Sequence, residues 1–164
     1  LERCPKEGSQ GVGQRRGDQA VERTEAAVAD ASVIAKWFVE ELYSDISLGL
    51  REDYVNLRLR LVVPHILRYE VLNALKFSGG FRTQELTKVA NSLEDYQFIE
   101  VPPNGKYAEE TVRIAMDYGL TIYDASYVAL GKVRGIAFYT ADQKLLEKTE
   151  EMGLVKHLKE YKGP

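Results

Sequence analysis

Apolar residues fall in short runs that alternate with stretches of helical periodicity. The short runs predict strands at 26–29, 60–64, 98–101, 135–140 and 154–158. Between them, apolar residues recur every three or four positions and predict helices at 32–41, 44–58, 66–77, 83–95, 105–118, 122–133 and 142–152. Strands that are separated by helices need crossover connections. The pattern therefore predicts an α/β fold with a mostly parallel central sheet and helices on both faces.

The helix at 44–58 is expected to turn Leu48, Tyr54 and Val55 inward. Together with the helix at 83–95, it carries enough apolar surface to cover a partner. Packing within one chain explains the same residues, so a dimer face here stays an open alternative.

Length and composition fit one ordinary domain. The chain has 164 residues, of which 45% are hydrophobic and 29% charged, as in folded globular proteins. No apolar run is long enough to span a bilayer, and no secretion signal is visible, so we expect a cytoplasmic protein without a membrane partner. The single cysteine, Cys4, excludes an intrachain disulfide and a zinc site built from several thiolates.

Residues 1–25 differ from the rest, because they contain glycines and a proline but no periodic apolar pattern, and position 1 is not Met. We interpret them as a flexible extension, and residues 26–164 as a single domain. The alternative is a basic arm that binds RNA. Acidic residues match the basic ones along this segment, which favours a leader that does not belong to the native domain.

The formal net charge of −3 gives the chain no overall attraction to nucleic acid. Any binding of nucleic acid must therefore depend on a local basic patch or on bound cations.

Acidic residues follow the ends of the predicted strands, which is the edge where parallel sheets bind ligands. Asp30 directly follows the first strand, and Asp142 lies two residues after the strand at 135–140. Glu70 lies in the helix after the second strand, and Asp124 begins the helix at 122–133.

Each aspartate also has a purely structural interpretation as part of a helix cap. Asp30 or Ser32 could cap the first helix, and Thr121 with Asp124 has the spacing of a capping box, as Thr140 has with Gln143. Glu70 is too far into its helix to cap it. It lies at the edge of the apolar stripe beside Asn73, and a glutamate that faces solvent remains the alternative there.

The four acids together indicate more than any one of them. Two unit charges 4 Å apart repel by ~4 kcal/mol at an effective dielectric constant of about 20. A cluster of carboxylates therefore needs compensation, which a divalent cation provides. Ligands that are all oxygen favour magnesium or manganese over zinc or copper.

Four segments resemble the acidic motifs of the PIN-domain ribonucleases: "VADASVIAKWFVEE", "VVPHILRYEVLNALKFSG", "LTIYDASYVALGKVRG" and "AFYTADQKLLEK". The similarity covers residues 26 to about 158 and is greatest to the VapC-type toxins of toxin–antitoxin pairs. It implies that Asp30, Glu70, Asp124 and Asp142 are catalytic, metal-binding carboxylates, and that Ser32, Asn73 and Thr140 are polar partners that orient them.

The resemblance also implies one or two Mg²⁺ or Mn²⁺ ions, an RNA substrate cleaved to 5′-phosphate and 3′-hydroxyl ends, a VapB-type antitoxin and a homodimer. Two alternatives stay open. One is the same nuclease used in RNA processing or decay without an antitoxin, and the other is a non-catalytic scaffold of this fold that binds RNA or protein.

Basic and aromatic residues near the acidic motifs have two interpretations each. Candidates for phosphate contacts are Lys36, Arg68, Lys76, Lys132 and Lys144, although solvated helix faces also explain them. Core packing is favoured over base stacking for Trp37, Phe38 and the tyrosines at 118, 123 and 127. We interpret His65 and His157 as surface or strand-end residues, because neither has a partner at metal-ligand spacing.

Overall fold

Five parallel strands form one sheet in the order β3-β2-β1-β4-β5. The computed structural model describes residues 24–164. Its strands are β1 (Glu25–Ala29), β2 (Leu59–Pro64), β3 (Ile99–Val101), β4 (Ala137–Thr140) and β5 (Val155–His157). The sheet is thus parallel throughout, which confirms and sharpens the prediction of a mostly parallel sheet.

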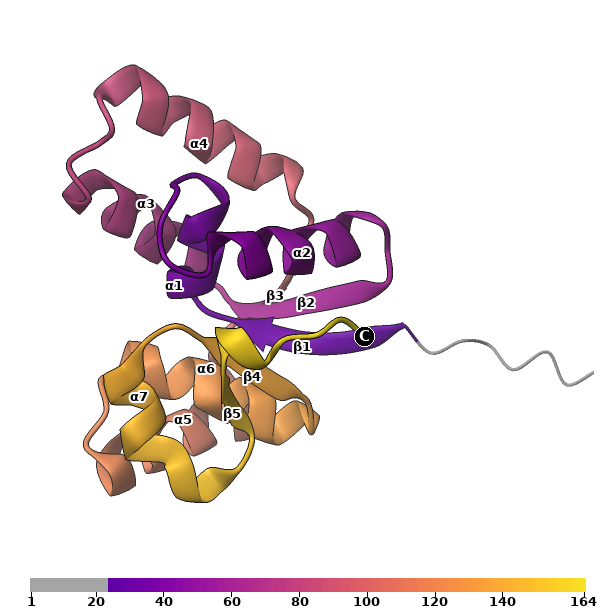
Figure 1. Ribbon diagram of the computed structural model, residues 1–164. Coiled ribbons are helices and arrows are strands. Elements are labelled where there is room, and N and C mark those ends of the chain that lie inside the picture. The colour runs from indigo at the N-terminus through magenta and orange to yellow at the C-terminus, as the bar shows by residue number, and fades with distance from the viewer. Residues whose placement is uncertain (1–23) are drawn as a thin grey trace, which may run out of the picture.

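Helices cover both faces of this sheet, as predicted (Figure 1). The first layer consists of α1 (Ala31–Ile34), α2 (Ser44–Val55), α3 (Leu67–Phe77) and α4 (Thr83–Asp95). The second layer consists of α5 (Gly105–Tyr118), α6 (Ile122–Arg134) and α7 (Gln143–Thr149). Short 3-10 turns at Ala35–Trp37, Glu150–Met152 and Leu158–Glu160 complete the connections. Within residues 24–164, no helix combines the length and apolar character needed to cross a membrane.

The centre of the core is β1, which pairs with β2 on one side and β4 on the other. Its residues Ala27, Val28 and Ala29 are all buried, because each face of the strand meets a helix layer. Val28 lies beside Phe138 of β4, which is fully buried. A central strand of small and branched residues lets both layers pack closely against it.

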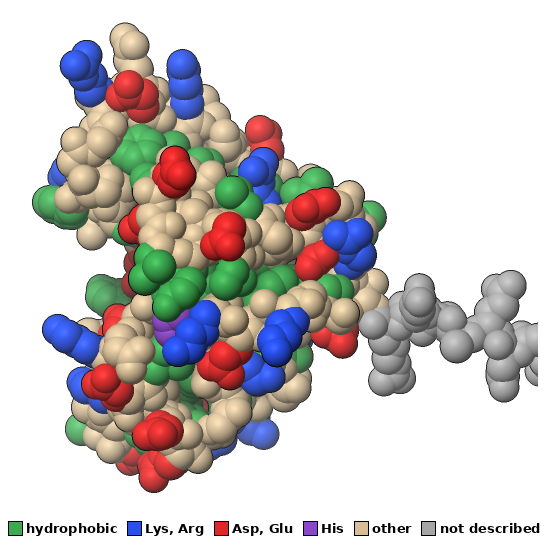
Figure 2. All heavy atoms as spheres, in the orientation of Figure 1, with side chains coloured by type: hydrophobic (Ala, Val, Ile, Leu, Met, Phe, Trp, Pro, Cys, Tyr) green, Lys and Arg blue, Asp and Glu red, His purple; other side chains and the backbone are tan. Residues whose placement is uncertain are grey.

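The strand order also fixes where a ligand can bind. From β1 the chain adds β2 and β3 on one side and then returns to add β4 and β5 on the other. Such a reversal opens a crevice at the carboxyl ends of the strands beside the switch point. Figure 2 shows the surface hollowed on its left side, between the two helix layers.

The first predicted helix is shorter than the sequence pattern indicated. Instead of running over 32–41, α1 ends at Ile34 and a 3-10 turn ends at Trp37. The Trp37 indole donates to the carbonyl of Ser47, 3.0 Å away, and the Ser44 hydroxyl donates to the carbonyl of Val39. These contacts with the start of α2 hold 38–43 in an irregular turn.

The orientation predicted for the second helix was partly wrong. Leu48 is 41% exposed and Val55 56% exposed, whereas Ser47 and Leu50 are buried. Residues 47, 50 and 54 follow the three-to-four spacing of one helix face, and this face packs toward the core. Leu48 and Val55 consequently lie on the outer face.

The extension predicted at 1–25 lies outside the described residues, except for its last two positions. Of these, Glu25 is already the first residue of β1.

Candidate active site at the carboxyl edge of the sheet

Asp30 lies where β1 ends and α1 begins, and it is buried, with 7% of its surface exposed. Its Oδ1 accepts from the backbone N–H of Val33, which makes Asp30 the N-cap of α1. The same oxygen accepts from the Ser32 hydroxyl, and Oδ2 accepts from the Thr140 hydroxyl, both at 2.5 Å. Asp30 is therefore a helix cap and also the best-anchored acid of the site.

Glu70 projects from the first turn of α3 and is half-buried. Its Oε2 accepts from the Tyr127 hydroxyl at 2.5 Å, which links α3 to α6 across the carboxyl edge of the sheet. The expected alternative of a glutamate that simply faces solvent does not describe this position.

Asp124 and Asp142 both take part in helix caps. The Thr121 hydroxyl donates to Oδ2 of Asp124 at 2.7 Å and accepts from the Asp124 backbone N–H. Oδ1 of Asp142 accepts from the backbone N–H groups of Lys144 and Leu145 at the start of α7.

Three of the acids keep an oxygen that has no hydrogen-bond partner among residues 24–164: Oε1 of Glu70, Oδ1 of Asp124 and Oδ2 of Asp142. None of these oxygens belongs to the buried, unpaired polar atoms of the described chain. They are therefore open to solvent and to a ligand.

The charges of Asp30 and Asp124 act on Glu70. Burial raises the pKa of Asp30 to about 6, although hydrogen bonds from Ser32 and Thr140 act to lower it. Burial also raises the pKa of Glu70, and the negative charges of Asp30 and Asp124 raise it further against the hydrogen bond from Tyr127. The structure thus places Asp30 and Asp124 near enough to Glu70 for their negative charges to raise its pKa.

Basic side chains do not neutralise this cluster. Among the ion pairs of residues 24–164, none includes Asp30, Glu70, Asp124 or Asp142. Repulsion between the acids is therefore left uncompensated by the described residues.

Two of the three predicted polar partners contact the acids. Ser32 bonds to Asp30 and also accepts from the backbone N–H of Ala141 at 2.8 Å. Thr140 is fully buried and accepts from the backbone N–H of Asp142 at 3.0 Å while it donates to Asp30. Asn73 is exposed, and within the described residues it forms no hydrogen bond to any of the acids.

Three of the basic residues proposed to contact phosphate already have carboxylate partners. Lys36 is buried and lies 2.7 Å from Glu41, Arg68 lies 2.7 Å from Glu100, and Lys132 lies 2.8 Å from Glu110. Lys76 lies over the ring of Phe77. Lys144, two residues after Asp142, is exposed and forms no ion pair within residues 24–164.

The donor set fits a hard divalent cation, although the side chains do not form a closed cage. Within residues 24–164, no three His, Cys, Asp or Glu side chains are already placed to hold one ion. Mg²⁺ is usually bound through one or two carboxylates and retains several waters, so it does not need such a cage. Converging carboxylates with open oxygens and uncompensated charge satisfy this requirement.

Residues 27–151 match the family model of the PIN domain. The chain belongs to the PIN domain family. It is 31% identical over 125 residues to the ribonuclease VapC3 of Pyrobaculum aerophilum, which covers 74% of this chain and 92% of that protein. It is also 31% identical over 106 residues to the exonuclease VapC9 of the same organism, which covers 60% of this chain and 74% of that protein.

The PIN fold is also seen in solved structures. A toxin–antitoxin complex from Klebsiella pneumoniae matches with a TM-score of 0.60 at 15% identity, over 80% of this chain and 97% of that one. At this identity the likeness concerns the fold alone.

One residue beside the acids has a role in the structure that the sequence did not indicate. Tyr127 was interpreted as core packing, and it is indeed 2% exposed, but its hydroxyl also holds Glu70. It lies three positions after Asp124, on the same face of α6. A polar aromatic residue at this spacing from an acid is the signal that could have identified it.

Proposed function

We propose that this PIN domain is a metal-dependent ribonuclease and the toxin of a toxin–antitoxin pair. The observation that carries the proposal is the convergence of Asp30, Glu70 and Asp124 at the switch point of the sheet, with no basic partner among residues 24–164. Similarity to the ribonuclease VapC3 over nearly its whole length supports RNA as the substrate.

Asp30, Glu70 and Asp124 would hold one or two Mg²⁺ or Mn²⁺ ions. Asp142, whose backbone N–H donates to the Thr140 hydroxyl, would contribute its open Oδ2. A bound dication lowers the pKa of its water and stabilises charge on the attacking and leaving oxygens of a phosphodiester. The chain's own contribution is to position and expose the acids.

Positioning comes from hydroxyl groups. Ser32 and Thr140 fix both oxygens of Asp30, and Tyr127 fixes one oxygen of Glu70. Glu70 leaves Oε1 open, and in this proposal that oxygen accepts the proton of the attacking water. Lys144 is the remaining candidate for contact with a substrate phosphate.

We further propose a VapB-type antitoxin and a homodimer as partners, and the cytoplasm as the site of action. The antitoxin is supported by the VapC-type relatives and by the similar fold found in a toxin–antitoxin complex. Co-purification with the product of an adjacent gene, followed by loss of cleavage in the complex, tests this part. A nuclease that works in RNA decay without an antitoxin would show neither.

Removal of divalent metal is expected to abolish RNA cleavage, because the acids repel phosphate unless a cation lies between them. Purified protein with EDTA should leave a labelled RNA intact, and added Mn²⁺ or Mg²⁺ should restore cleavage. A circular RNA of the same sequence distinguishes internal cleavage from the exonuclease activity named for VapC9. Cleavage that persists in excess EDTA would contradict the metal-dependent mechanism.

Thr140→Val is expected to lower kcat about 10- to 100-fold, the range typical of residues that orient a ligand. The substitution keeps the shape of the side chain but removes the hydroxyl that donates to Asp30 and accepts from Asp142. Thr149→Val is the matched control, because Thr149 is equally buried and its hydroxyl donates only to the carbonyl of Leu145. Equal loss of kcat in both variants would assign Thr140 a general structural role.

A further inference from the structure

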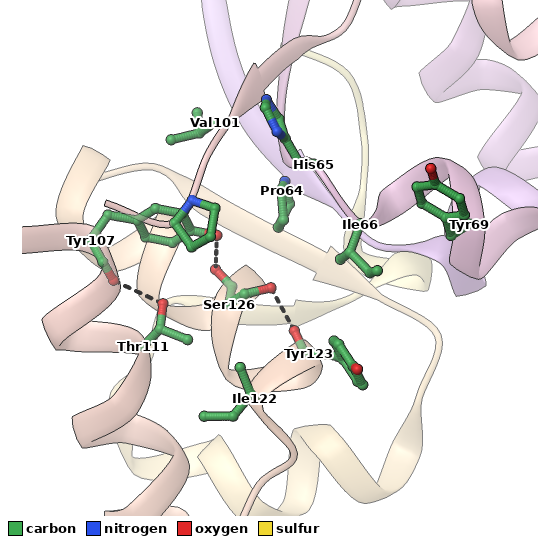
Figure 3. Close-up of a pocket in the computed structure, with 11 residues that line it drawn as sticks. Pro64, His65, Ile66, Tyr69, Val101, Tyr107, Thr111, Ile122, Tyr123 and Ser126 are labelled. Carbon is green, nitrogen blue, oxygen red and sulfur yellow. Dashed lines mark hydrogen bonds between the residues drawn. The ribbon is translucent and has the colours of Figure 1, made fainter. Parts of the chain in front are cut away.

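A pocket of about 300 Å³ opens beside the acidic site, at the carboxyl ends of β2 and β3 (Figure 3). Pro64 and Val101, the last residues of these strands, form its floor together with Tyr107 of α5. Residues at the start of α3 and α6 complete the wall. Its volume is at the lower end of the range for small-ligand sites.

Two tyrosines of the pocket lining are sequence neighbours of the acids. Tyr69 directly precedes Glu70 on α3, and Tyr123 directly precedes Asp124 on α6. The pocket therefore begins one residue before each of these two acids along its helix, although the acids themselves do not line it. Figure 3 shows the two tyrosines on the same side of the pocket.

The lining carries no Asp, Glu, Lys or Arg. Its inner polar groups are already paired with backbone carbonyls: the Tyr107 hydroxyl donates to Ser126, the Ser126 hydroxyl to Tyr123, and the Thr111 hydroxyl to Tyr107. The imidazole of His65 also lines the pocket and can hydrogen-bond a ligand. A ligand here would therefore be flat or apolar, and it would be held mainly by stacking and burial rather than by ion pairs.

The two bordering rings are unusually exposed. Tyr69 is 74% exposed and Tyr123 57% exposed, whereas Tyr107 at the floor is 6% exposed. Exposed rings beside a site for phosphate provide the combination by which proteins hold single-stranded nucleic acid.

We propose that this pocket holds one base of the RNA substrate, next to the scissile phosphate, by stacking on Tyr123 and Tyr69. The inference rests on the proposed ribonuclease function and adds a subsite to it. Charge favours this occupant, because a nucleotide joins an anionic phosphate, suited to a metal on the acids, to an uncharged flat base, suited to the neighbouring pocket. Because stacking is the main contact, we expect only a weak preference for base identity at this position.

The test is cleavage of an RNA series in which an abasic site is placed in turn at each position around the cleaved bond. Wild-type protein should show a KM raised about 5- to 150-fold at one position beside that bond, because a stacked base contributes that much to binding. Tyr123→Ala should raise the KM for intact RNA similarly and abolish the additional abasic penalty, with kcat retained. Tyr123→Phe should keep the wild-type KM.

Phe77→Ala is the matched control, since Phe77 is also 74% exposed on α3 but does not line the pocket. Its KM should equal that of the wild type. A uniform abasic profile with an unchanged KM in Tyr123→Ala would overturn the base subsite and leave the ribonuclease function intact. A change of molar mass by light scattering or weaker antitoxin binding in Tyr123→Ala, without a change in KM, would assign the pocket to a protein partner and overturn the proposal. Absence of metal-dependent cleavage by the wild type would overturn both proposals.

Discussion

Asp124→Asn is expected to reduce metal-dependent RNA cleavage by more than about 100-fold while the protein still folds. A neutral amide is a poor ligand for a hard dication, and the expected loss exceeds the 10- to 100-fold typical of residues that only orient ligands. Folding should survive, because an asparagine oxygen can still accept from the Thr121 hydroxyl and the backbone cap does not involve the charge. Initial rates of cleavage at saturating Mn²⁺, with circular dichroism as a check of the fold, measure this effect.

Asp95→Asn is the control, because Asp95 is exposed at the end of α4, away from the acidic site. Its cleavage rate should equal that of the wild type. Asp142→Asn should lose less activity than Asp124→Asn, since Asp142 is the only one of the four acids that is exposed. Full activity in Asp124→Asn would refute the assignment of this residue as a ligand.

The order and type of the secondary-structure elements could be predicted because the signals for them are local. Short apolar runs stop at Pro64 or at the aspartates, and helices start at caps such as Thr121, so strand and helix boundaries agree with the structure to within a few residues. The helix predicted at 32–41 failed because its end depends on Trp37, which reaches the carbonyl of Ser47 ten residues away. A periodic pattern contains no information about such a contact.

For the site, too, local features could be predicted from the sequence, whereas contacts between distant residues could not. Positions of the acids follow from the rule that ligands bind at the carboxyl ends of parallel strands. Their hydrogen bonds do not, because Thr140 reaches Asp30 across 110 positions and Tyr127 reaches Glu70 across 57. Lys36 was a candidate for phosphate contact because it lies close to Asp30 in sequence, but in the structure it is buried and paired with Glu41.

Helix capping and ligand binding are not competing roles for these aspartates. A carboxylate has about four lone-pair positions, and the caps of α6 and α7 each use a single oxygen. At Asp124 and Asp142, capping fixes the side chain in one rotamer and leaves the other oxygen open, whereas both oxygens of Asp30 accept hydrogen bonds. The local signals that favoured the structural interpretation thus describe how the site is held in place.

Asp30→Asn is expected to stabilise the metal-free protein at neutral pH, because it removes a buried negative charge that costs about 3 kcal/mol. The gain is reduced by the amide NH2, which cannot accept from the Thr140 hydroxyl as Oδ2 does. In the folded state burial raises the pKa of Asp30 from its ordinary value of 3.8 to about 6. Folding therefore favours the protonated carboxyl. This contribution is fully present below pH 3.8 and is lost as the pH rises through about 6. The wild type should lose stability between pH 4 and pH 7, whereas the asparagine variant should lose much less. Urea denaturation in EDTA at several pH values measures the difference.

Asp53→Asn is a control of opposite sign. Although burial acts to raise the pKa of Asp53, hydrogen bonds from Tyr161 and Arg58 lower it overall, so the charged form stabilises the fold and the variant should be less stable at neutral pH. Added Mn²⁺ should raise the denaturation midpoint of the wild type and of Asp53→Asn but not that of Asp30→Asn, because only ligands that bind the native state shift unfolding. If the wild type and Asp30→Asn lose the same stability between pH 4 and pH 7 without metal, the charge at Asp30 does not destabilise the fold, and the physical reason for a cation at this site disappears.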